Sequence, residues 1–486
     1  MRASGILLPI SSLNNRYGIG TFGLEAYKFI DFLNDSGQKF WQVLPLGPTS
    51  FGDSPYQTFS VFAGNPYFVD FDLLKDEKLL EYNEYQNMVC SEGDIDYLFQ
   101  YENRYLILKK AYKRFKGDEK YNKFLNDNKD WLNDYAMFMA IKSITPKSSW
   151  EQWDRDYRFR QGEKYQLFIE KNKDEIDFWK FIQYCFLKQW KDLKNYANKK
   201  GIKIIGDLPI YVAYDSSDIW SNPLNWQLDG NLMPLAVAGC PPDEFALDGQ
   251  LWGNPLYNYS LMAKDGFSWW INRFKHAFEL FDYVRVDHFR GFEAYYSIPY
   301  PARNAKSGSW VKGPGLSFFQ KIKEKLGNLN IIAEDLGFLT DKVYQLRDDA
   351  GFMGMKVLQF AFNHDKESEY LPHNHIKHSI CYTGTHDNPP TKAWLKILNE
   401  KDLTFLYKYL DIKNDDEALE KVIEAALASV CNFSIIPMQD YLGLGEEARI
   451  NRPATIGGNW LWRLKDNDLN KELSAKILTW TKTYKR

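Results

Sequence analysis

The stretch YVRVDHFRG, residues 283–291, places two arginines, an aspartate and a histidine among residues that favour burial. Val284 and Val286 are typical of a β-strand, and the polar side chains gather toward the end of the run. Arg285 lies two residues before Asp287, so both side chains leave the same side of a strand. The stretch therefore predicts a strand whose end presents polar groups to a shared site.

Seven further β-rich runs have the same form: they are short and apolar, and they end in polar residues, Gly or Pro. They cover residues 5–10, 39–47, 203–212, 330–337, 355–362, 379–388 and 433–443. Several are nearly continuous apolar runs, as expected of parallel strands that are buried on both faces.

Amphipathic helical patterns lie between these runs. The clearest occupy residues 23–37, 177–201, 267–281 and 340–352, the last with Thr340 as its expected cap. Eight strands that alternate with helices predict an α/β fold, a (β/α)8 TIM barrel. A doubly wound sheet is the alternative, but no GxGxxG turn follows the first strand.

The spacing of the strands is uneven, which predicts large insertions in one catalytic barrel that spans residues 1–486. Residues 72–200 contain helical patterns at 97–115 and 133–144 and predict a mostly helical insertion subdomain. Residues 213–265 are rich in Pro, Gly, Trp and Asn. They predict a loop-rich insertion over the active site, because long loops in a compact domain usually carry function.

Composition argues against several classes of protein. The chain has 486 residues with 61 basic and 64 acidic side chains, a net charge of −3, which gives no support for a nucleic-acid groove. Five cysteines without a CxxC pair argue against a disulfide framework or a structural zinc site. No stretch has the ~20 apolar residues of a membrane span, and the apolar run at the N-terminus is too short for a signal peptide. We expect a soluble cytoplasmic protein.

Polar residues follow the predicted strands at their carboxyl ends, where barrels of this class form their active sites. They are Asp207, Arg285, Asp287, His288, Glu334, Asp335, His386, Asp387, Asn388, Gln439 and Asp440. Together they predict a carboxylate-rich site, the acidic cup, at one end of the barrel.

Several carboxylates beside an arginine suit the cleavage of glycosidic bonds. One acid must protonate the leaving oxygen, while a second carboxylate attacks or stabilises the oxocarbenium-like centre. The guanidinium of Arg285 favours the ionised form of Asp287, which suits a nucleophile. Glu334 follows the apolar residues 331–333 and is predicted to be the less solvated carboxyl, which suits a proton donor.

Other interpretations of these residues stay open. A lone aspartate near a strand end can brace a loop, and we interpret Asp335 and Asp440 in this way; a core position explains His288 equally well. A polar loop is favoured over a metal cluster for three neighbouring histidines, His373, His375 and His378. A metal-dependent barrel hydrolase would use His and Asp at strand ends. A sugar-binding module without catalysis would need the aromatic residues but not the acids.

Several motifs resemble the 4-α-glucanotransferase family, also called amylomaltase or disproportionating enzyme, of the α-amylase clan. RVDHFRG, IIAEDLG and TGTHDN occur in this order at residues 285–291, 331–337 and 383–388. The resemblance covers nearly the whole chain and is most specific in GCPPDEFALDGQLWGNPLY at 239–257 and NWLWR at 459–463.

The resemblance implies transfer of α-1,4-glucan segments between maltooligosaccharides or starch- and glycogen-type glucans, by a retaining mechanism with a covalent glucosyl–aspartate. It implies Asp287 as nucleophile, Glu334 as general acid/base and Asp387 as stabiliser of the transition state. The implied substrate-binding residues are Tyr56, Asp207, Trp252, Arg285, His386 and Asn388. It implies no cofactor, no metal, and no nucleic-acid or membrane partner. An α-glucan hydrolase of the same clan is the alternative.

Two segments are candidates for favouring transfer over hydrolysis. The loop 239–257 is expected to cover the site with Pro241, Pro242, Phe245, Leu251 and Trp252. Residues 51–67 offer three rings for stacking on sugars, those of Phe51, Tyr56 and Phe59. The alternative is that these aromatics pack the insertions onto the barrel. Two stretches depart from the family pattern, PISSLNNRYG at 9–18 and the pair Pro389–Pro390.

Overall fold

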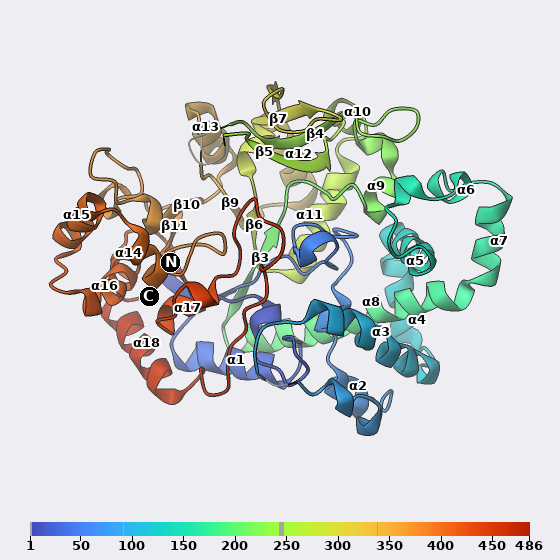
Figure 1. Cartoon of the computed structure of the whole chain (residues 1–486), viewed down its shortest axis with the longest axis horizontal. Helices are drawn as coiled ribbons and strands as arrows, with labels where there is room; N and C mark the ends of the chain where they lie inside the picture. Colours follow the sequence, from blue (N-terminus) through green and yellow to red (C-terminus); the bar gives the residue numbers. More distant parts are fainter. Residues whose placement is uncertain (1, 91, 243–246, 338) are drawn as a thin grey trace.

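The computed structural model describes residues 2–90, 92–242, 247–337 and 339–486 (Figure 1). Within them, all eight predicted strands form one parallel sheet in the order β10-β11-β12-β1-β2-β3-β6-β9. Their bounds are β1 Ala3–Leu7, β2 Phe40–Gln42, β3 Lys203–Leu208, β6 Tyr283–Val286, β9 Ile331–Ala333, β10 Gly354–Val357, β11 Ser379–Tyr382 and β12 Phe433–Pro437.

The two outer strands of this sheet meet and close it. Ile332 of β9 forms a parallel bridge with Met353, the residue before β10, and the Ala333 N–H donates to the Met353 carbonyl at 2.8 Å. The sheet is therefore a closed barrel, and the predicted (β/α)8 fold is confirmed.

Alternate residues of the strands belong to two separate apolar clusters. Ile205, Ile332 and Ile435 lie in a small cluster with residues from the other strands, which fills the barrel. Their neighbours Ile204 and Ile436 belong to the large cluster between the strands and the helices. Burial on both faces explains why these strands are continuous apolar runs in the sequence.

Helices cover the outside of the barrel, and the four predicted ones are present as α1 Leu24–Asp35, α8 Lys173–Lys199, α11 Ser268–Leu280 and α13 Asp341–Ala350. The others are α12 Gly315–Leu326, α14 Thr391–Ile397, α15 Glu400–Leu410, α16 Asp415–Ala428, α17 Met438–Tyr441 and α18 Lys471–Thr483. Thr340 is the N-cap residue of α13, as predicted, but its side chain makes no capping hydrogen bond. Helix α14 begins directly after Pro390.

The segment between β2 and β3 is mostly helical. It contains α2 Phe71–Asp76, α3 Tyr97–Arg114, α4 Glu119–Asp127, α5 Lys129–Ile144, α6 Arg155–Arg158 and α7 Glu163–Lys171 before α8. Helix α8 contacts β3, α1 and α11 of the barrel and also α3, α4 and α5 of this segment. One helix therefore joins the inserted helices, to the right in Figure 1, to the barrel. No helix of the described ranges is long and apolar enough to span a membrane.

The segment 213–265 contains more regular structure than its loop-like sequence predicts. It forms α9 Ser217–Ser221, β4 Ala236–Cys240, β5 Gln250–Pro255 and α10 Tyr259–Lys264. β4 pairs with β5 and with β7 Ala294–Pro299, and β7 pairs with β8 Ser309–Lys312, in an antiparallel sheet of order β5-β4-β7-β8. Gly239 allows the close pairing, because a Cβ there would lie 2.0 Å from the Gln250 carbonyl oxygen.

Candidate active site

An arginine joins the predicted residues of β3 and β6. The register of these strands places Asp207 beside Arg285. Nη1 of Arg285 donates to both carboxylate oxygens of Asp207, at 2.9 and 2.7 Å, and Nη2 lies 2.9 Å from Oδ1 of Asp287. The side chains of Arg285 and Asp207 are 4% and 0% exposed, while that of Asp287 is 28% exposed. Arg285 thus holds the carboxylate of Asp287, which remains accessible from the acidic cup.

Tyr56 connects this cluster to the end of β11. Its hydroxyl donates to Oδ2 of Asp207 at 2.8 Å, and its ring stacks on His386 with centroids 5.2 Å apart. Nε2 of His386 lies 3.4 Å from Oδ1 of Asp387. The structure therefore brings together six of the predicted site residues, namely Tyr56, Asp207, Arg285, Asp287, His386 and Asp387.

Two groups from the C-terminal segment hold Asp387. Asn451 Nδ2 donates to its Oδ1 at 2.6 Å, and Arg449 Nη2 donates to its backbone carbonyl at 3.3 Å. Both residues were missed by the sequence reasoning, although they lie in a polar stretch soon after the last strand. Trp460 was also missed; its ring lies 5.9 Å from Tyr56 and 6.1 Å from His386.

Glu334 reaches the cluster from β9. Its Oε2 accepts the backbone N–H of His288 at 2.6 Å, and its own N–H donates to the Val286 carbonyl at 3.0 Å. These bonds place the Glu334 carboxyl beside the end of β6, next to the residue after Asp287.

Burial raises the pKa of Asp287 to about 7, against the opposing effect of Arg285. Burial also raises the pKa of Glu334 well above its ordinary value. Arg285 contacts Asp287 directly, so Asp287 is the group of this pair that ionises first. Different protonation states of the two groups, with Asp287 ionised and Glu334 protonated, suit one nucleophilic carboxylate and one proton donor.

The predicted substrate-binding residues Trp252 and Asn388 have other contacts. The ring of Trp252, in β5, meets the ring of His288 edge to face with centroids 4.9 Å apart. Oδ1 of Asn388 accepts the N–H and the hydroxyl of Thr385, both at 2.9 Å. Asn388 thus closes the turn after β11, and its role in binding stays a prediction.

The other strand-end acids brace the fold, in line with our interpretation. Asp335 accepts from Arg347 and from the Met355 N–H. Asp440 accepts from Thr383 and Thr391.

The three neighbouring histidines bond to different groups. His373 bonds to Tyr409, His375 to Ser429 and the Tyr370 carbonyl, and His378 to the Gly351 carbonyl. Among the residues that the structure describes, no group of three or more His, Cys, Asp or Glu is placed to hold a metal ion.

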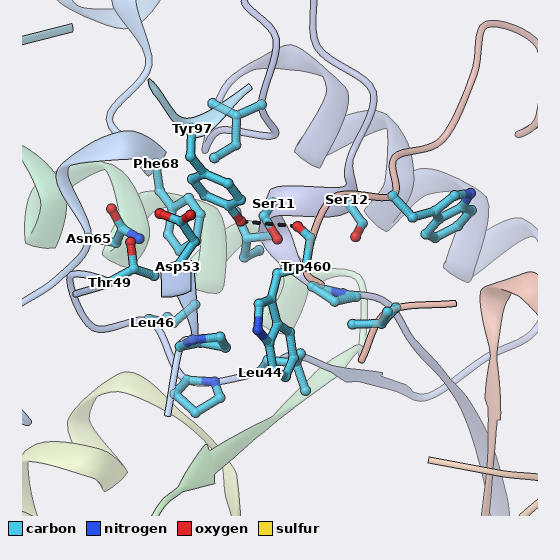
Figure 2. A pocket seen from close by; sticks show the side chains of 17 residues that line it. Ser11, Ser12, Leu44, Leu46, Thr49, Asp53, Asn65, Phe68, Tyr97 and Trp460 are labelled. Atoms are coloured by element: carbon cyan, nitrogen blue, oxygen red, sulfur yellow. Dashed lines mark hydrogen bonds between the residues drawn. The ribbon is translucent and has the colours of Figure 1, made fainter. Parts of the chain in front are cut away.

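A small pocket adjoins the cup (Figure 2). Ser11, Asp53, Tyr97 and Trp460 contribute to its wall. The Tyr97 hydroxyl donates to the Trp460 carbonyl at 3.0 Å. None of the three predicted catalytic acids lines this pocket, so the pocket lies beside the predicted site and does not contain these acids.

Part of the loop expected to cover the site lies outside the described residues, namely 243–246 with Phe245. Leu251 is 39% exposed. Phe59 packs on Phe138 of α5 with centroids 6.1 Å apart, which fits the alternative that this ring joins the insertion to the barrel.

A closed (β/α)8 barrel with a cluster of acids around one arginine is typical of enzymes that act on glycosidic bonds. A family model described as 4-alpha-glucanotransferase matches residues 8–470. A 4-alpha-glucanotransferase from Clostridium butyricum is 48% identical over 485 residues, which cover 99% of this chain and 100% of the relative. One from Thermus thermophilus is 42% identical and covers 98% and 97%.

A solved structure gives the same result. Amylomaltase from Streptococcus agalactiae, in complex with acarbose, is 42% identical and superposes with a TM-score of 0.97 over 100% of both chains. The chain belongs to the 4-alpha-glucanotransferase family.

Proposed function

We propose that this protein transfers α-1,4-glucan segments between maltooligosaccharides or starch- and glycogen-type glucans. The observation that carries the proposal is the contact of Arg285 with both Asp207 and Asp287, beside a second acid whose pKa burial raises. The names of the full-length relatives support the choice of substrate. The Streptococcus agalactiae relative was solved with acarbose, and we expect this ligand to bind in the acidic cup.

In the first step, Asp287 attacks the anomeric carbon of the donor and forms a glucosyl ester, while Glu334 gives its proton to the leaving glycosidic oxygen. In the second step, the Glu334 carboxylate takes the proton of an acceptor hydroxyl, which attacks the same carbon and frees Asp287. Two inversions give net retention.

The neighbours of these acids support the assigned roles. Arg285 stabilises the ionised nucleophile. Asp387, held by Asn451, is 44% exposed and can accept hydrogen bonds from sugar hydroxyls. Burial lowers the pKa of His386, so its neutral ring can donate to the same sugar.

Transfer requires that a sugar hydroxyl attacks the ester before water does. A bound acceptor makes this attack effectively unimolecular, and a covered site excludes water. We propose that the insertion 213–265 covers the cup and that Trp252 and Tyr56 bind sugar rings. We further propose a single catalytic barrel over 1–486 with residues 72–200 as a helical subdomain. The five free cysteines support a cytoplasmic location.

Maltotriose as the sole substrate tests the proposal. We expect glucose and a ladder of longer maltooligosaccharides, with little rise in total reducing ends. A steady rise in reducing ends, without products longer than maltotriose, would identify an α-glucan hydrolase.

Trp252→Ala should shift the products toward hydrolysis or weaken acceptor use. Trp310→Ala is the matched control, because Trp310 lies on β8 at the opposite edge of the same sheet. Equal product shifts in both variants would contradict a binding role for Trp252.

A further inference from the structure

His288, the residue after the predicted nucleophile, has a left-handed backbone. Its φ and ψ are 51° and 48°, a region that residues other than glycine rarely adopt. Such strain persists only where the surroundings fix it, and it gathers at functional sites. The conformation therefore marks His288 as a candidate functional residue.

The left-handed turn aims two consecutive backbone amides at Glu334. The N–H of His288 donates to Oε2 of the Glu334 carboxyl at 2.6 Å. The N–H of Phe289 donates to the Glu334 carbonyl oxygen at 3.2 Å. Because Oε2 already accepts a hydrogen bond, the proton of the neutral carboxyl belongs on Oε1. The turn thus fixes both the position of the carboxyl and the oxygen that carries its proton.

The imidazole of His288 is confined by its neighbours. It meets the ring of Trp252 edge to face at 4.9 Å, and the ring of Tyr211 lies 6.3 Å away. A Cβ at Gly291 would lie 3.3 Å from Cδ2 of His288. Nε2 is buried and has no hydrogen-bond partner within the described part of the chain. Burial lowers the pKa of the ring to about 3, so the ring is neutral and contributes its shape.

We propose that His288 is a positioning residue, whose left-handed backbone, packed under Trp252, holds the Glu334 carboxyl in place for proton transfer. The inference rests on the proposed function and deepens it. It also connects β5 of the inserted sheet to the proton donor through two side-chain rings.

The hydrogen bond to Oε2 stabilises the ionised form of Glu334. Other groups that act on Glu334 are Arg285 and Asp287 from β6, Asp335 after β9, and Tyr370 after β10. None of these is changed by a substitution at residue 288. Loss of the hydrogen bond should therefore raise the pKa of Glu334, and the alkaline limb of activity should move to higher pH.

The test compares two donors in variants of His288. The leaving group of maltotriose must be protonated as its bond breaks, whereas the fluoride of α-maltosyl fluoride leaves without a proton donor. The ratio kcat/KM reports only the steps up to and including this first bond cleavage. His288→Val disfavours the left-handed region, and we expect it to lower kcat/KM for maltotriose by about 30-fold. The fluoride should lose less than about threefold, and the alkaline limb should shift upward. Asparagine adopts the left-handed region readily, so His288→Asn should keep kcat/KM for each donor within about threefold of the wild type.

Asp411→Val is the matched control, because Asp411 has φ of 53° at the end of α15, far along the chain from the site. It should leave the ratio of the two donors unchanged. If His288→Val does not fold, His288→Ala replaces it under the same criteria. Equal losses on both donors, or an unmoved alkaline limb, would overturn the proposal. Failure of the wild type to use maltotriose would instead overturn the proposed function.

Discussion

Glu334 and Asp335 are adjacent in the chain but have different partners, which predicts opposite effects for two isosteric substitutions. Glu334 contacts the end of β6 through the His288 N–H. Asp335 forms a buried ion pair with Arg347 of α13, with side chains 1% and 5% exposed. Glu334→Gln removes the proposed proton donor and keeps the shape of the side chain, while Asp335→Asn removes one charge of the ion pair.

General acid catalysis contributes about 10²–10⁴-fold, so we expect Glu334→Gln to raise the barrier by about 3–5 kcal/mol. Its stability should change little, because the raised pKa of Glu334 favours the neutral carboxyl and glutamine is neutral and has the same shape. Removing one partner of a buried ion pair costs about 3 kcal/mol or more of unfolding free energy. Asp335→Asn should therefore lose about 3 kcal/mol of stability and less than about tenfold in turnover.

Glucose release from maltotriose gives kcat, and urea unfolding followed by circular dichroism gives the free energy of unfolding. Retention of activity within about tenfold in Glu334→Gln, a change near 1.4 kcal/mol, would refute its role as proton donor. An Asp335→Asn variant that is stable but inactive would contradict the structural role of Asp335 and favour a catalytic one.

Three further results are expected. Asp287→Asn should lower turnover by several orders of magnitude while its circular dichroism stays native. A glucosyl ester trapped on another carboxylate of this variant would contradict the assignment of Asp287 as the nucleophile. EDTA should leave activity intact and elemental analysis should find no stoichiometric zinc; a loss that zinc restores would favour a metallohydrolase. The kcat/KM for maltotriose should be bell-shaped in pH. Activity falls below the Asp287 pKa of about 7, because the nucleophile becomes protonated, and falls again as pH rises through the raised pKa of Glu334. An alkaline limb that persists in Glu334→Gln would assign that limb to another group.

The barrel strands were predictable because strands that are buried on both faces have continuous apolar sequences. The antiparallel sheet was not, because β4 and β5 contain Gly239, Gly253 and Pro255, which resemble loop residues. Their strand conformation depends on pairing: β4 pairs with β7, a segment distant in sequence, and β5 pairs with β4. The sequence of β4 and β5 alone does not indicate this pairing.

In the site, too, some features were predictable from the local sequence and others were not. The clustering of the acids was predictable because each follows a strand, and parallel strands end together. Asn451 was missed because its partner, Asp387, is reached only through the folded C-terminal segment. The left-handed backbone of His288 was missed because no glycine marks it.

The pairing of Asp207 with Arg285 also bears on how the barrel avoids misalignment during folding. Their side chains meet because β3 and β6 are aligned in one register. A slip of one residue would turn the two groups to opposite faces of the sheet. A slip of two would bury a charge without its partner, at a cost of several kcal/mol. The ion pair that takes part in the proposed site therefore also penalises barrels whose strands are misregistered.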